Sequence, residues 1–154
     1  MYYPVTSGGS AQYLRLSEMD LGDSDPTNGL KWMVILACNS LQHDNWDDMQ
    51  SQGIMPYNGN LHLLLGTASV NSTSSVLLQY WARYMNYGRG SLSPMTMRAA
   101  WYQAARDAYS EKSFTNTVTF AVAGDSACID DYIEAGFNSS PQGSWTYDSS
   151  QAWP

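Results

Sequence analysis

Charge is the first property that this sequence lacks. Only 14% of its 154 residues are charged, against roughly 25% in an ordinary soluble domain. Lysine occurs twice, lysine and arginine together number seven, and fourteen acidic residues bring the net charge to −7. Because phosphate affinity depends on lysine and arginine, this composition argues against nucleic acid and anionic membranes as partners.

Long apolar runs are also missing. The longest, from Trp32 to Cys38, is far shorter than the roughly 20 residues of a membrane span. We therefore expect no membrane span. The first residues lack the basic and apolar regions of a signal peptide. Ser, Thr, Asn, Gly and Tyr are abundant instead, which is typical of extracellular or cell-surface proteins. We expect that location, with the leader absent from this chain.

Cysteine is scarce, with two copies, Cys38 and Cys128. In an exported protein these two could form a disulfide, and the sequence leaves that open. We interpret Cys128 as a small buried apolar residue. A chain of this length can bury a real core in one domain without such a bond.

What the chain does contain is an alternation of strand and helix patterns. Two helices are predicted, one from Ser74 or Ser75 to a stop at Gly88, and one from the N-cap Ser93 and Pro94 to Ala108. The apolar runs 32–37 and 61–65 suit neighbouring parallel strands. We predict fold class α/β, a three-layer α/β/α sandwich with a mainly parallel sheet. The domain would cover 1–136, followed by an extended aromatic tail, 137–154. The predicted strands are 2–6, 12–16, 32–37, 61–65 and 117–122.

Cys38 is the candidate nucleophile. It directly follows a buried strand, and ligands of such sheets gather just beyond the carboxyl ends of the strands. The thiol would need a nearby base to become a thiolate. The alternative is a cysteine that only packs at the strand end.

The segment 32–41, WMVILACNSL, resembles the nucleophile strand of the caspase-like cysteine peptidase superfamily. That superfamily includes caspases, gingipains and bacterial CHAT domains. The segment 61–67, LHLLLGT, resembles its next strand, and the order of elements over roughly 3–125 is similar to the gingipain-like and CHAT-like branch. The resemblance implies a three-layer α/β fold and a Cys–His pair with Cys38 as nucleophile.

The base is where this sequence departs from that family. There the histidine precedes the cysteine and is usually followed by glycine, whereas here Gly8 and Gly9 occupy that place and no histidine precedes Cys38. The domain is then either a non-catalytic relative or uses another histidine. His62 lies within an apolar strand, and the alternative for it is a buried structural role. His43 follows on a polar loop, where the alternative is simple solvation.

Acidic loops offer the only metal candidates. Asp20, Asp23 and Asp25 could supply oxygen ligands for Ca²⁺, but their spacing is not that of an EF-hand. A second acidic cluster is Asp44, Asp47 and Asp48, and a third is Asp125, Asp130 and Asp131, with Glu134. We interpret all of them as acidic loops and helix N-termini favoured by the helix dipole. We expect no cofactor or metal, with Ca²⁺ on the first loop as the alternative.

Aromatic side chains suggest partners. Trp145, Tyr147 and Trp153 could anchor the tail on another protein or on a second copy of the chain. The alternative is a tail that covers the edge of its own sheet.

Three functions follow from these features. The first is a non-catalytic caspase-like extracellular module for binding or self-assembly. The second is a cysteine peptidase with Cys38 as nucleophile and His62 or His43 as base. The third is a carbohydrate-binding surface with a glycan partner. The absent upstream histidine favours the first.

Overall fold

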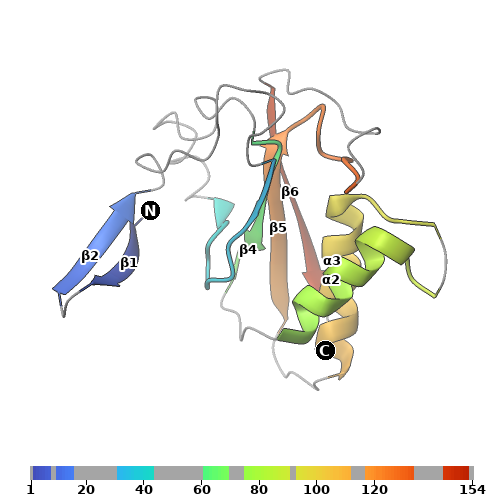
Figure 1. The fold of residues 1–154 in the computed structure, drawn as a ribbon, viewed down its shortest axis with the longest axis horizontal. Helices are drawn as coiled ribbons and strands as arrows, with labels where there is room; N and C mark the ends of the chain where they lie inside the picture. The colour runs from blue at the N-terminus through green and yellow to red at the C-terminus, as the bar shows by residue number, and fades with distance from the viewer. Residues whose placement is uncertain are drawn as a thin grey trace.

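The computed structural model describes residues 2–7, 10–15, 31–43, 61–69, 75–90, 93–111, 117–133 and 144–152. These residues form two sheets and two helices (Figure 1). The first sheet is a hairpin of β1 (Tyr2–Ser7) and β2 (Ser10–Arg15), paired antiparallel. This confirms the strands expected at 2–6 and 12–16. Figure 1 shows the hairpin, in blue, to one side of the other elements.

The second sheet has four strands in the order β3-β4-β5-β6. The first pair, β3 (Trp32–Val34) and β4 (Leu63–Thr67), is parallel, with Trp32 opposite Leu63 and Val34 opposite Leu65. The prediction that the two apolar runs are parallel neighbours is therefore confirmed. β4 is buried throughout, whereas β3 is half-buried because it stands at the edge of this sheet.

The other two strand pairs correct the prediction of a mainly parallel sheet. β5 (Val118–Asp125) runs antiparallel to β4, and β6 (Trp145–Ala152) runs antiparallel to β5. The fold is α/β with a mixed sheet. The segment expected as an extended tail contains β6, which pairs with β5 along its whole length. Residues 145–152 of that segment are thus part of the sheet.

The helices are α2 (Ser75–Tyr87) and α3 (Met97–Glu111). α2 ends as predicted, since Gly88 has a φ of 66° and its N–H donates to the carbonyl of Tyr84 at 3.0 Å. α3 begins later than the Ser93-Pro94 signal indicated. Thr96 caps it instead, because its Oγ1 accepts a hydrogen bond from the N–H of Ala99 at 3.3 Å.

Apolar clusters cover both faces of the four-stranded sheet. On one face both helices pack against Leu63, Leu65 and Phe120, and Figure 1 shows α2 and α3 together on one side of β5. Trp101 of α3 is fully buried there, edge-on to Phe120 with ring centroids 5.6 Å apart. The other face carries a smaller cluster, with the residues Ile35, Leu41, Leu61, Leu64, Ala121 and Ala123. No helix among the described residues is long and apolar enough to cross a membrane.

Candidate functional site

The chain beyond β3 forms a tight structure at the carboxyl end of the parallel strand pair, which we call the Cys38 turn (residues 35–43). It stays beside the extension of β4 through backbone hydrogen bonds. The N–H of Asn39 donates to the carbonyl of Ser69 at 3.0 Å, and that of Leu41 donates to the carbonyl of Thr67 at 2.8 Å. Asn39 has a φ of 55°, a left-handed conformation that asparagine tolerates better than most residues.

Ser40 anchors the Cys38 turn from inside the protein. Its side chain is buried, and its Oγ donates to the carbonyl of Ile35 at 3.0 Å and accepts from the N–H of Thr67 at 3.0 Å. The Thr67 hydroxyl donates to the carbonyl of Ala37 at 2.7 Å. Gly66 leaves the room that Ser40 needs, since a Cβ at Gly66 would lie 2.5 Å from the Ser40 Oγ. The turn is therefore held by specific polar contacts.

Two of the predicted site residues lie on this turn. Both Cys38 and His43 are exposed. The ring of His43 stands edge-on to Tyr147 of β6, with centroids 5.2 Å apart, and the Tyr147 hydroxyl donates to the carbonyl of Leu41 at 2.8 Å. Cys38 and His43 thus lie on the same turn, and His43 faces Tyr147, which pairs with Ala123 opposite Leu64 in β4.

His62 lies at the opposite end of the sheet. It directly precedes β4, where its N–H donates to the carbonyl of Lys31 at 2.7 Å and its carbonyl accepts from the N–H of Asp125 at 3.0 Å. Asn39 is hydrogen-bonded to Ser69, well beyond His62 along the chain, and a strand rises about 3.3 Å per residue, so His62 is roughly 20 Å from Cys38. The structure does not bring His62 and Cys38 together.

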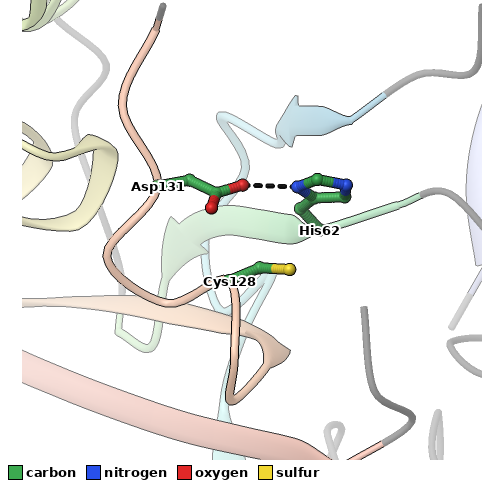
Figure 2. Close-up of side chains that lie close together, drawn as sticks. All are labelled: His62, Cys128 and Asp131. Carbon is green, nitrogen blue, oxygen red and sulfur yellow. Dashed lines mark hydrogen bonds and ion pairs between the residues drawn. The ribbon is translucent and has the colours of Figure 1, made fainter. Parts of the chain in front are cut away.

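The partners of His62 come from the turn after β5. Its Nδ1 is hydrogen-bonded to the carboxylate of Asp131, and Cys128 lies beside both residues (Figure 2). All three side chains are buried, and their ligand-type atoms lie within 4.8 Å of one another. We call these three residues the His62 cluster.

The thiol of the His62 cluster is held in its protonated form. Burial, together with the carboxylates of Asp131 and Asp125, raises the pKa of Cys128 to about 12, while Lys31 opposes them. A buried thiol with this pKa is a poor nucleophile without an added positive charge. Neither Cys128 nor Cys38 is in a disulfide.

Sequence reasoning missed the His62 cluster. Cys128 was expected to be a small apolar residue, which its burial fits, but the neighbouring imidazole and carboxylate were not foreseen. The sequence places Asp131 in an acidic loop or helix N-terminus, yet its side chain is buried, 2% exposed. His62 and Asp131 are 69 positions apart, so no local spacing could have paired them.

The remaining predicted residues divide into two groups. Trp145 and Tyr147 of β6 are half-buried and pack against the apolar cluster of Leu64 and Ala121. They therefore contribute to the packing of their own chain. Asp20, Asp23, Asp25, Asp44, Asp47, Asp48, Glu134, Trp153 and the Gly8-Gly9 pair lie outside the described residues.

These features define an α/β domain with an exposed cysteine turn at one end of a mixed sheet and a buried His/Cys/Asp cluster at the other. The chain belongs to the family described as "Domain of unknown function (DUF6345)", whose model matches residues 6–151. No curated protein and no solved structure matches the chain.

Proposed function

We propose that this protein is a caspase-like module with a three-layer arrangement that acts outside the cell as a non-catalytic binding domain. Its partner is another protein or a second copy of the chain, and the contact surface is the exposed side of the Cys38 turn. One observation carries the proposal. The only buried imidazole of the chain is bonded to Asp131 at the far end of β4, where it cannot serve Cys38 as a base.

His62 is too far from Cys38 to act as its base. General-base activation of a thiol needs an imidazole within hydrogen-bond reach, about 3 Å, and His62 is roughly 20 Å away by strand geometry. The chain has two histidines, so only His43 is left. Its ring stands edge-on to Tyr147, a packing contact that holds the ring at the turn surface.

The architecture of the Cys38 turn suits a binding surface. The polar contacts of Ser40 and Thr67 hold the backbone in one conformation, so little conformational entropy is lost when a partner docks. Cys38, Gln42 and His43 are exposed on it. Because few residues of the chain are charged, little electrostatic repulsion opposes contact between this surface and a partner.

The competing function is a cysteine peptidase in which Cys38 attacks the peptide carbonyl and His43 accepts the thiol proton. The exposure of both residues on the Cys38 turn favours it as second candidate. The resemblance to caspase-like peptidases supports the same reaction.

Thiol labelling of the full chain separates the two functions. We expect an electrophilic peptide ketone to label Cys38 slowly, with a rate that rises linearly with reagent and is the same in H43A. Loss of labelling in the C38A variant identifies Cys38 as the labelled residue. The H62A variant, at the opposite end of the sheet, is a control that should leave the labelling rate of Cys38 unchanged. Saturable labelling at neutral pH that is lost in both C38A and H43A would establish the peptidase instead. Light scattering over a concentration series measures whether the chain associates with itself, which distinguishes a second copy of the chain from a different protein as the partner.

A further inference from the structure

The His62 cluster combines three side chains that are each a common metal ligand. His62, Cys128 and Asp131 supply an imidazole nitrogen, a sulfur and a carboxylate oxygen, and all three are buried. Figure 2 shows the side chains of His62 and Asp131 pointing toward each other and Cys128 beside them. The three come from the start of β4 and from the turn after β5.

Backbone hydrogen bonds hold these ligands in place. The turn after β5 closes on itself, since the N–H of Cys128 donates to the carbonyl of Asp125 at 2.9 Å and the N–H of Asp131 donates to that of Cys128 at 3.0 Å. The carbonyl of Asp131 accepts from the N–H of Met97 at 2.7 Å, at the start of α3. The cluster is therefore built on ordered backbone, as a binding site requires.

The chemistry of the set selects the ion. Nitrogen, sulfur and carboxylate oxygen together suit Zn²⁺, whereas Ca²⁺ and Mg²⁺ prefer oxygen alone. With bonds of about 2.0–2.3 Å, tetrahedral zinc holds its ligand atoms roughly 3.3–3.6 Å apart. The atoms of the cluster lie within 4.8 Å of one another, so side-chain rotations that move them by about 1 Å complete the geometry.

We propose that His62, Cys128 and Asp131 form a zinc site that joins the start of β4 to the turn after β5. When Zn²⁺ binds, a zinc–sulfur bond forms, the Cys128 thiol proton leaves to solvent, and no electron is transferred. The doubly positive ion offsets the charges of the Cys128 thiolate and the Asp131 carboxylate, both of which are buried. Water takes the fourth position of the metal.

A zinc ion at this site would join separate parts of the fold. It lies at the end of the sheet opposite the Cys38 turn, and it connects three elements, β4, the turn after β5 and the start of α3. Zinc should therefore raise the stability of the fold without changing the labelling rate of Cys38. The zinc site and the proposed binding function can fail independently of each other.

Cobalt is a spectroscopic probe for the site, because a cobalt–thiolate bond gives an intense charge-transfer band in the near ultraviolet. The full chain, treated with chelator and dialysed, is titrated with Co²⁺ and then with Zn²⁺. We expect the band to saturate at one Co²⁺ per chain and to disappear when Zn²⁺ displaces it. Zn²⁺ should also raise the melting temperature of the unmutated protein, whereas Mg²⁺ should not.

Two matched pairs of variants locate the ligands. C128S should abolish the charge-transfer band, and C38S, which changes the exposed cysteine, should retain it. D131N should weaken Co²⁺ binding at least about tenfold, whereas D130N should not, since Asp130 is exposed and pairs with Arg98 at 2.7 Å. Absence of the band and of any zinc effect on melting of the unmutated chain would overturn the proposal and leave the cluster as a buried hydrogen-bonded pair beside a thiol. Loss of the band in C38S would overturn it as well.

Discussion

Replacing Ser40 with alanine tests whether polar contacts hold the Cys38 turn in place. The Ser40 Oγ donates to the carbonyl of Ile35 and accepts from the N–H of Thr67, both at 3.0 Å, in a site where Ser40 is 1% exposed. Alanine removes both contacts and leaves the Thr67 N–H and the Ile35 carbonyl without that partner. Water has no ready access to replace it.

The expected cost follows from these contacts. A buried donor or acceptor left unsatisfied costs about 1–3 kcal/mol, and the carbonyl, with two lone pairs, loses less than the N–H. We expect Ser40→Ala to lower the free energy of unfolding by about 2–3 kcal/mol. At roughly 2–4 °C per kcal/mol for a chain of this size, the melting temperature should fall by about 4–12 °C.

Urea unfolding followed by circular dichroism measures this loss, with the slope m checked for constancy between variants. Ser110→Ala is the matched control, because Ser110 is exposed on α3 and its Oγ donates to the carbonyl of Asp107 at 3.0 Å. The control should change stability by less than about 0.5 kcal/mol. If the two variants lose equally little, the buried contacts of Ser40 do not stabilise the turn and the reasoning is wrong.

Two further predictions concern the sheet and the helix pair. A Cβ at Gly124 would lie 2.2 Å from the carbonyl oxygen of His62 and 3.0 Å from the Cα of Leu63. Because both are backbone atoms, Gly124→Ala should separate β4 from β5 and lower the free energy of unfolding by about 3 kcal/mol. An unchanged urea midpoint would contradict this. Burial and a hydrogen bond to Asp107 raise the pKa of Tyr84 to about 12, whereas the pKa of tyrosine in the unfolded chain is about 10. The stability that Tyr84 contributes is therefore complete below pH 10 and is lost as the pH rises through 12. Unfolding at pH 9 and pH 11 should therefore show a smaller alkaline loss in Tyr84→Phe than in the unmutated chain, and equal losses would refute the assignment.

The elements with local signals could be predicted from the sequence alone. The spacing of Leu77, Tyr80 and Tyr84 with a glycine stop defined α2, because helix periodicity and capping depend on residues within one or two turns. The apolar runs that became β3 and β4 were recognisable as parallel neighbours, because only a strand covered on both faces has no polar alternation. The position of Cys38 beyond β3 followed from the same reasoning.

Only the tertiary structure decided the rest. β6 has the sequence WTYDSSQA, too polar to stand out as a strand, since an edge strand needs apolar residues only where it faces the core, and its pairing with β5 supplies the remaining stability. The sheet became mixed because β5 and β6 run against their neighbours, and strand direction depends on where distant segments meet. The His62 cluster has the same origin: its imidazole and carboxylate are 69 positions apart, and the antiparallel crossing of β4 and β5 brings the start of one strand beside the end of the other.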